Sequence, residues 1–375
     1  MHIVIIGNGV AGATVAQKLT NKGFAVTLFA EEPYGFYSRI MLPHSLYDKE
    51  ALAHLITNNN PPYLVKKPVT GIFPGEKQVE TADGERYPYD KLVIATGSRS
   101  RTLDIFANTD GVCSLRTFYD AHLIGDILRS PVVVLGGGLL GLETALSLTK
   151  KGFDVTVCEA ADRILVRQLD TPAATKLKAR LEHEGVSVKE GVRTIGKRLD
   201  SWEKLVALEV EGKEEIPCRT LILSLGVSPE VTLARAAGLR IQRGVLVDEY
   251  LRTSDEDIYA IGDCAEYKGQ IPGIVPVALA MAETVIANLT GGDTSYEEPV
   301  LFTRFKDDDL VITSVGDVTG RALRKESDTR YEAYFLKDGN LVGAILYGSG
   351  EHLKFVRSNY QKPVSEEEIA RLLDF

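Results

Sequence analysis

The chain has 375 residues, 44% of them hydrophobic, which is enough for two or three domains of roughly 100–150 residues each. Its formal net charge of −9 excludes nucleic acid and anionic membranes as main partners, because both require a basic face. The four cysteines lie far apart without CxxC spacing, so we expect buried thiols in a reducing compartment, with no disulfide framework and no metal site.

The chain begins with an apolar, strand-like run at residues 2–6 that has no basic leader, so we expect a cytoplasmic protein. A glycine-rich turn follows it, formed by Gly7, Gly9 and Gly12. In a βαβ unit such glycines allow a tight turn, the approach of backbone N–H groups to a pyrophosphate, and close packing of helix and strand. The next strand ends at Glu31 and Glu32, and we prefer Glu32 as the acid that binds an adenosine ribose.

The same pattern recurs at a constant offset of 129 residues. The second glycine turn consists of Gly136, Gly138 and Gly141. Further along, residues 92–97 fall on residues 221–226. The repeat predicts an α/β fold with two Rossmann-like, doubly wound domains, each of which binds a dinucleotide.

The second copy carries acids at two informative positions. Glu159 ends the strand after the glycine helix, where a carboxylate binds a free 2′-hydroxyl and repels a 2′-phosphate, so NADH is favoured over NADPH. Arg163 either tolerates a phosphate or is a surface arginine paired with Glu159. Glu143, just inside the helix, either positions the nicotinamide or is simply favoured by the helix dipole.

A further strand-like run at 257–261 leads into Gly262 and Asp263, and a helix is expected at about 277–289. Because this helix contains Glu283, the apolar stretch around it cannot span a bilayer. We expect the chain to return here to complete the first domain. The expected boundaries are 1–106 and 229–295 for the first domain, 107–228 for the inserted second domain, and 296–375 for a small C-terminal α+β domain.

The C-terminal segment changes to alternating patterns at 310–313 and 330–335, with a turn at 337–340. A last helix opens at Ser365 with acidic residues that suit a helix N-terminus.

Two nested dinucleotide folds, a strand ending in Ala95-Thr96-Gly97 and a later run at 253–263 together resemble the pyridine nucleotide-disulfide oxidoreductase superfamily of flavoproteins. The resemblance covers essentially the whole chain. Tyr37, Arg39 and Leu42 are similar to a motif of rubredoxin and flavorubredoxin reductases and of the flavin domain of assimilatory nitrite reductases. The resemblance implies that the first domain binds FAD and that the second binds NADH, with NADPH less favoured.

The resemblance and the glycine motifs together predict two sets of binding residues. The FAD set is Gly7, Gly9, Gly12, Glu32, Arg39, Ala95, Thr96, Gly97, Arg101, Gly262, Asp263 and Val277. The NAD(H) set is Gly136, Gly138, Gly141, Glu143, Glu159 and Gly226. Asp263 is implied to bind the ribityl chain, and Arg39 the flavin or its phosphates unless it is an ordinary surface arginine. We expect His44 to lie at the surface and Cys264 in the core. We also expect that no residue acts as a catalytic acid or base.

Disulfide reductases of this superfamily carry a redox-active cysteine pair after the second strand, but residues 34–45 contain no cysteine. Electrons must then leave the flavin directly. The resemblance implies an NADH:rubredoxin-type oxidoreductase that passes hydride from NADH to FAD and single electrons to a small redox protein. Alternatives are an NADH oxidase that uses O2 and a redox-sensing flavoprotein similar to apoptosis-inducing factor.

An acidic carrier such as rubredoxin needs local positive charge to dock. The C-terminal candidates are Arg304, Lys306, Arg321, Arg324 and Lys325, although the run 307–309 is acidic and a mixed solvated face is the simpler interpretation. The segment has no His-x-x-x-x-Glu, which favours a monomer or a non-catalytic dimer. We also expect the N-terminus of the helix after Pro276 to stabilise negative charge on the reduced flavin.

Overall fold

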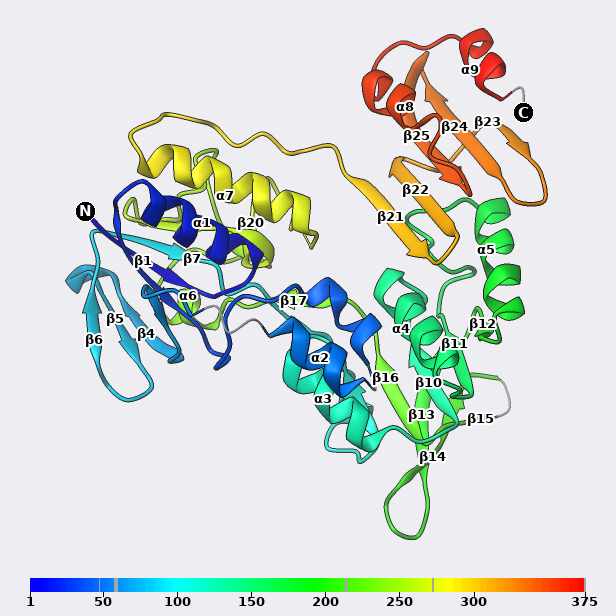
Figure 1. The fold of residues 1–375 in the computed structure, drawn as a ribbon, viewed down its shortest axis with the longest axis horizontal. Helices are drawn as coiled ribbons and strands as arrows, with labels where there is room; N and C mark the ends of the chain where they lie inside the picture. Colours follow the sequence, from blue (N-terminus) through cyan, green and yellow to red (C-terminus); the bar gives the residue numbers. More distant parts are fainter. Residues whose placement is uncertain (47, 57–59, 213–214, 272, 374–375) are drawn as a thin grey trace. The chain divides into compact units, whose positions relative to one another are not determined.

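A computed structural model describes residues 1–46, 48–56, 60–212, 215–271 and 273–373 (Figure 1). The chain divides into two compact units. The first consists of Met1–Leu42, Asp48–Arg101 and Gly226–Pro299, and the second of Pro43–Tyr47, Thr102–Leu225 and Val300–Phe375. The second unit therefore interrupts the first in sequence, and it also contains the C-terminal segment.

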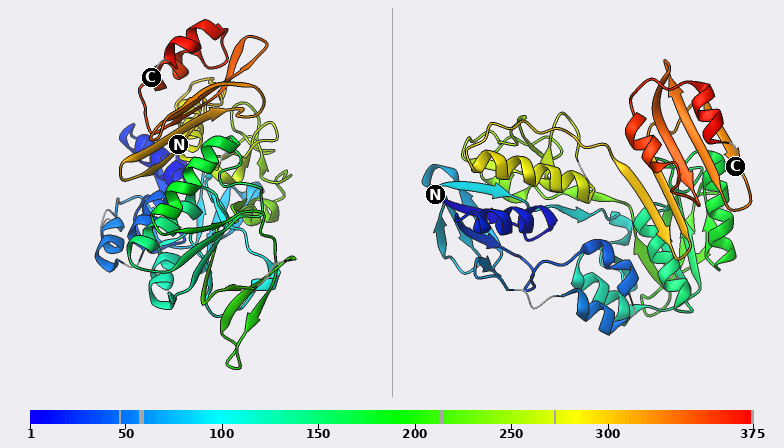
Figure 2. Two further views of the ribbon diagram at one scale, coloured as in Figure 1. Left: turned by 90° about the vertical axis from the view of Figure 1, so that its right-hand side faces the viewer. Right: turned by 45° about the horizontal axis from the view of Figure 1, so that its top comes forward.

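The first unit is built on a parallel five-stranded sheet in the order β19-β7-β1-β2-β3. Its strands are β1 (His2–Ile6), β2 (Ala25–Phe29), β3 (Leu64–Val65), β7 (Lys91–Ile94) and β19 (Ile258–Ala260). Most of their residues are buried, as in parallel sheets that are covered on both faces. The helices α1 (Val10–Asn21) and α7 (Val275–Leu289) lie side by side (Figures 1 and 2).

Smaller elements complete the first unit. An antiparallel sheet is formed by β4 (Val69–Phe73), β5 (Gln78–Thr81) and β6 (Arg86–Pro88). Two-stranded pairs join β8 (Ser98–Ser100) to β17 (Val227–Pro229) and β18 (Val245–Leu246) to β20 (Ala265–Glu266). The short helices are α2 (Lys49–Leu55), α6 (Thr232–Ala236) and the 3-10 turns Arg39–Met41, Pro74–Glu76 and Gly262–Cys264.

The second unit contains a matching parallel sheet in the order β12-β11-β10-β16-β9. Its strands are β9 (Val112–Ser114), β10 (Val132–Leu135), β11 (Val155–Cys158), β12 (Ser187–Lys189) and β16 (Thr220–Leu223). The helices are α3 (Phe118–Ile127), α4 (Leu139–Lys150) and α5 (Thr171–His183), with 3-10 turns at Pro43–Ser45 and Asp104–Phe106. A smaller antiparallel sheet holds β13 (Thr194–Leu199), β14 (Leu205–Val210) and β15 (Ile216–Pro217).

The internal repeat is visible in the backbone. Helix α1 and helix α4 start and end at the same offset of 129 residues, and so do the strand pairs β7/β16 and β8/β17. Gly7 and Gly136 donate backbone hydrogen bonds to Phe29 and Cys158, which are also equivalent, at 2.9 and 2.8 Å. The fold prediction of two Rossmann-like domains, the second inserted in the first, is therefore confirmed.

The C-terminal part folds as an antiparallel sheet in the order β21-β22-β25-β24-β23. Its strands are β21 (Phe302–Asp307), β22 (Leu310–Gly316), β23 (Ala322–Glu326), β24 (Tyr331–Lys337) and β25 (Asn340–Tyr347). Val356 of α8 (Leu353–Asn359) and Ile369 of α9 (Glu366–Leu372) pack into its core, so both helices cover one sheet face (Figure 2). Ser365 caps α9 in a capping box with Glu368, as the acidic opening predicted.

Helix α7 and the four cysteines lie close to what the sequence predicts. Helix α7 begins at Val275, two residues earlier than expected, because Pro276 fits the first helical turn, where its missing N–H costs nothing. All four cysteines are buried and stand outside any disulfide, as predicted. None of the helices in the described ranges combines the length and hydrophobicity that a bilayer span requires.

Candidate functional site

The first glycine turn has no room for side chains at two positions. Gly7 has a φ of 110°, and a Cβ there would overlap the carbonyl oxygen of Ala95 on the neighbouring strand. A Cβ on Gly12 would overlap the carbonyl oxygen of Gly7. Gly9 is the N-cap of α1 and provides no side-chain cap, so the first backbone N–H groups of the helix remain available to an anion.

Glu32 lies in a cluster with Tyr37 and Arg39. The Tyr37 hydroxyl donates to the Glu32 carboxylate at 2.8 Å, and Arg39 Nη2 donates to it at 2.8 Å. Glu32 is 23% exposed, whereas Glu31 is 74% exposed and lies 4.0 Å from Arg99. Burial would lower the pKa of Arg39, but the attraction of Tyr37 and Glu32 outweighs it and raises that pKa. Of the two acids, Glu32 is the one held in a fixed position.

Arg39 joins this cluster to the glycine turn. Its Nη1 lies 3.6 Å from the place that a Cβ on Gly9 would occupy. Its Nε is buried and has no hydrogen-bond partner in the part of the chain that the structure describes. A buried donor without an acceptor is costly, so this atom points to an acceptor supplied by a ligand at the turn.

The Gly262–Asp263 turn lies beside the first turns of α1 and α7. Gly262 has a φ of 72°, and a Cβ there would lie 3.6 Å from the Ala11 side chain of α1 and 4.0 Å from the Ala278 side chain of α7. Asp263 accepts a hydrogen bond from the Ser98 hydroxyl at 2.7 Å. Val277 is buried in the first turn of α7. The structure thus brings Asp263 and both helix starts together, and Ser98 is a neighbour that the sequence analysis missed.

The residues after β7 serve the backbone of the first unit. Ala95 donates its N–H to Ile6 at 2.8 Å, and the Thr96 hydroxyl donates to the Glu230 carbonyl at 2.7 Å. Gly97, with a φ of 71°, accepts from the Glu230 N–H at 2.9 Å. Arg101 is exposed and donates through Nε to the Ser228 hydroxyl at 3.3 Å. These bonds link the 95–101 segment to Ile6 of β1, to Ser228 of β17 and to Glu230, which follows β17.

The second glycine turn reproduces the first. Gly136 has a φ of 122°, and a Cβ there would overlap the carbonyl oxygen of Ser224, the equivalent of Ala95. A Cβ on Gly141 would overlap the carbonyl oxygen of Gly136. Gly138 is an extended N-cap without a side-chain cap, so α4 also presents free N–H groups. Gly226, with a φ of 80°, begins the Gly226–Pro299 segment of the first unit.

Glu159 is fixed by two backbone donors. It accepts from the Gly137 N–H at 2.7 Å and from the Ala161 N–H at 2.8 Å. Arg163, in contrast, donates to the carbonyl of Leu169 at 3.2 Å and pairs with Asp162 at 3.1 Å. The suggested pair between Arg163 and Glu159 is therefore wrong, because Arg163 is used to hold the turn that follows β11.

Glu143 is a titratable group with unusual surroundings. Burial raises the pKa of its carboxyl group to about 7. The described residues supply it with neither a salt bridge nor a hydrogen bond. The equivalent residue of the first copy is Thr14, whose hydroxyl bonds back to Val10 at 2.7 Å. A carboxyl group at this place is thus not needed for a glycine-turn helix to form.

The capping of the longer helices separates two groups. Helices α3 and α5 are capped by the side chains of Thr117 and Asp170. Helices α1, α4 and α7 have no side-chain cap and no acid in the first turn. These three N-termini are the ones that the sequence analysis assigns to cofactors, and each carries the partial positive charge of a helix N-terminus.

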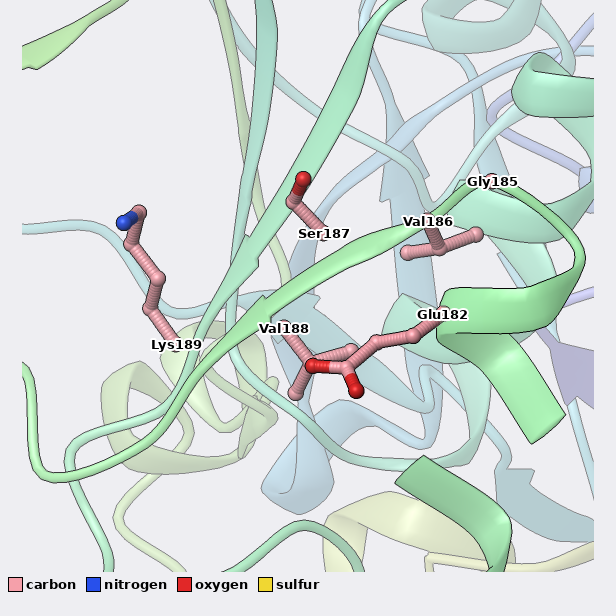
Figure 3. Close-up of a pocket in the computed structure, with 6 residues that line it drawn as sticks. All are labelled: Glu182, Gly185, Val186, Ser187, Val188 and Lys189. Carbon is pink, nitrogen blue, oxygen red and sulfur yellow. The ribbon is translucent and has the colours of Figure 1, made fainter. Parts of the chain in front are cut away.

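Other candidates lie outside this arrangement. His44 is exposed on a 3-10 turn. Cys264 is buried, its thiol donates to the carbonyl of Ile261 at 3.2 Å, and burial raises its pKa, so core packing explains it. A shallow groove of about 350 Å³ follows the edge strand β12 and the end of α5 (Figure 3). Its lining consists of Glu182, Gly185, Val186, Ser187, Val188 and Lys189, none of which is a predicted cofactor residue.

The sequence and the fold of this chain are similar to those of known proteins. The family model described as pyridine nucleotide-disulphide oxidoreductase matches residues 1–282. The rubredoxin-NAD(+) reductase of Pseudomonas putida is 36% identical over 323 residues, which cover 80% of this chain and 83% of that protein. A crystal structure of a ferredoxin reductase from Rhodopseudomonas palustris has a TM-score of 0.88 and 27% identity, with 98% of this chain and 96% of that chain covered.

A nitrite reductase (NAD(P)H) of Bacillus subtilis is 29% identical over 391 residues. The match covers 99% of this chain and 48% of that protein, so the chain spans about half the length of this relative.

Proposed function

The chain belongs to the pyridine nucleotide-disulphide oxidoreductase family, and from this membership we propose that it passes electrons from NADH to a small electron-carrier protein of the rubredoxin type. FAD and NADH are the cofactors of this family and of its NADH-rubredoxin reductases. The protein is an FAD-dependent oxidoreductase. The carrier is proposed from the names of relatives, which include rubredoxin-NAD(+) reductase and NADH-rubredoxin oxidoreductase.

The residues of the first unit fit FAD. Within the described residues the buried Nε of Arg39 has no acceptor, and the uncapped N-terminus of α1 presents backbone N–H groups that suit a phosphate. We propose that Glu32 binds the adenosine ribose, that Gly9 and Arg39 face the pyrophosphate, and that Asp263, aligned by Ser98, binds the ribityl chain. The N-terminus of α7 is the proposed source of positive potential for the reduced ring.

The residues of the second unit fit NADH. Glu159 holds its carboxylate at the glycine turn, where it would accept from ribose hydroxyls and repel a 2′-phosphate. Arg163 is bonded to Leu169 and Asp162, which favours NADH over NADPH. Glu143, with its pKa raised to about 7, is proposed to bond the nicotinamide carboxamide. When bound, FAD accepts a hydride from NADH and can release the electrons singly, which suits an iron carrier.

The position of the cysteines carries the proposal about the acceptor. Residues 34–45 contain no cysteine, and the four cysteines elsewhere are buried and form no disulfide. Burial raises the pKa of Cys113 and of Cys218 to about 12, so these thiols are unreactive. A relay through a disulfide therefore has no residues to use, and electrons leave from the flavin itself. Cysteines that form no disulfide also favour a cytoplasmic location. We further propose that the protein is a monomer, or a dimer whose subunits share no catalytic residues.

The test is steady-state oxidation of NADH by the FAD-loaded protein, with O2 removed from every assay except the one in which O2 is the acceptor. Rubredoxin, a [2Fe-2S] ferredoxin and O2 are compared as acceptors. Fast reduction of rubredoxin or the ferredoxin is expected. Turnover with O2 alone identifies an NADH oxidase instead. Negligible turnover with every acceptor, together with a change of oligomeric state on addition of NADH, identifies a redox-sensing flavoprotein.

A further inference from the structure

Three exposed arginines lie in one short stretch of the first unit. Residues 231–247 contain Arg235, Arg240 and Arg243 and no acid, in a chain whose formal net charge is −9. Arg235 and Arg240 have no ion-pair partner in the described part of the chain. Arg243 lies 3.8 Å from the carboxylate of Glu266, and its own side chain is 62% exposed. We call residues 231–247, which carry these three arginines, the arginine segment.

The backbone of the arginine segment is held in place. The buried carboxylate of Glu266 accepts from the N–H groups of Arg243 and Gly244 at 2.7 and 2.8 Å. The N–H of Arg240 donates to the Ser254 hydroxyl at 3.1 Å. The charges therefore sit on a fixed loop, which lowers the entropy cost of presenting them to a partner.

The arginine segment borders the predicted FAD residues of the same unit. Just before α6, Glu230 is bonded to Thr96 and Gly97 at 2.7 and 2.9 Å. Strand β18, which follows Gly244, pairs with β20, which follows the Gly262–Cys264 turn that contains Asp263. The two ends of the segment are thus connected to proposed FAD residues, one end to Thr96 and Gly97 and the other to the turn that contains Asp263.

We propose that the arginine segment is the docking surface for an acidic electron-carrier protein. This inference rests on the proposed function, because an acidic rubredoxin-type acceptor is its premise. A chain with net negative charge repels such a carrier, so productive encounters require a local positive surface. The exposed guanidinium groups of Arg235 and Arg240, which have no ion pair within the described residues, provide one. Guanidinium groups are also suited to bind carboxylates in two-point contacts.

The basic residues of the C-terminal sheet do not form an equivalent surface. Arg304 and Lys306 lie on β21 at one edge, and Arg324 lies on β23 at the opposite edge. Arg324 also lies 3.8 Å from Asp170, and Arg321 lies 3.4 Å from Glu366. The sheet topology therefore divides the candidates that the sequence had grouped.

The test is a charge reversal, Arg235→Glu with Arg240→Glu, in the FAD-loaded full chain. Rubredoxin is the acidic probe, and cytochrome c is the basic probe. The reversal is expected to raise the KM for rubredoxin about tenfold at low salt and to lower the KM for cytochrome c. Reduction of a neutral quinone and the KM for NADH stay unchanged. The matched control, Arg304→Glu with Lys306→Glu, leaves all of these values near those of the parent protein.

A second readout covers a reversal that disturbs the fold. The milder pair Arg235→Gln with Arg240→Gln is titrated with oxidised rubredoxin, and a weaker Kd that becomes less sensitive to salt supports the proposal. An unchanged Kd and an unchanged KM for rubredoxin overturn the docking surface and leave the proposed function intact. A parent protein that reduces the quinone but not rubredoxin counts against the proposed carrier, and with it against this inference.

Discussion

The carboxylate of Glu159 accepts a hydrogen bond from the backbone N–H of Gly137 at 2.7 Å. This bond ties the acid at the end of β11 to the second glycine turn. Because the carboxylate charge is what repels a 2′-phosphate, Glu159→Gln is expected to raise the KM for NADH about tenfold and to reduce the preference for NADH over NADPH. Steady-state kinetics with both nucleotides measure this.

The control for Glu159 is Asp162→Asn, which removes an exposed carboxylate from the same loop. It is expected to leave the ratio of kcat/KM for the two nucleotides unchanged. A Glu159→Gln protein that keeps its full preference for NADH would show that another residue sets the specificity.

Glu32 and Glu31 are adjacent in sequence and differ in their contacts. Glu32 bonds Tyr37 and Arg39, whereas Glu31 is 74% exposed. Glu32→Ala is expected to lose most of its bound FAD during purification, because it removes a ribose acceptor and the partner of Arg39. Glu31→Ala should retain FAD. The ratio of flavin to protein absorbance measures the outcome, and equal retention in both variants would rule out the assignment of Glu32.

The sequence predicted the features that repeat or follow a local period. Gly7 and Gly136 were found because equal spacing marks equal backbone turns, and the structure gives both a positive φ. The bond between Ser98 and Asp263 was not predictable, because 165 residues separate the two and neither belongs to a periodic pattern. Likewise, the sequence does not reveal that Arg163 donates a hydrogen bond to the carbonyl of Leu169, because that contact depends on the path of a loop.

Glu143 gives a pH dependence with a definite sign. Its pKa is raised to about 7 from the usual value of 4.5, so the folded protein keeps a proton that the unfolded chain releases between these values. Stability is therefore expected to fall as pH rises from about 4.5 to 7, and to change little from this cause above pH 7. Glu143→Gln removes this loss, so it should stabilise the protein at pH 8 and leave it unchanged at pH 4.

Thermal unfolding of the Glu143→Gln protein at several pH values measures this difference. Glu182→Gln, which removes an exposed carboxylate from α5 in the same unit, serves as control and should show no such trend. If the stabilisation by Glu143→Gln is the same at pH 5 and pH 8, the raised pKa is refuted.

Lys150, in the last turn of α4, forms ion pairs with Asp307 and Asp308 at the end of β21. Next to them, Arg180 of α5 forms an ion pair with Asp309 at 2.8 Å. Asp307 is 11% exposed, whereas Asp309 is 73% exposed. Because screening by water weakens exposed pairs, Asp307→Asn is expected to cost about 1 kcal/mol and Asp309→Asn close to zero. A double-mutant cycle with Lys150→Ala checks the pair, and zero coupling energy for Asp307 would contradict it.

Glu332 on β24 is a fully buried carboxylate with three side-chain donors. Arg330 and Tyr334 donate to it at 2.7 Å, and His352 Nδ1 lies 2.7 Å from it. Replacing it by Gln leaves Arg330 without its buried counter-charge, so Glu332→Gln is expected to cost about 3 kcal/mol of unfolding free energy. Glu351 also pairs with Arg330 but is 65% exposed, and Glu351→Gln should cost less than about 1 kcal/mol. Denaturant unfolding followed by circular dichroism compares the two, and equal losses would show that the buried carboxylate does not organise this sheet.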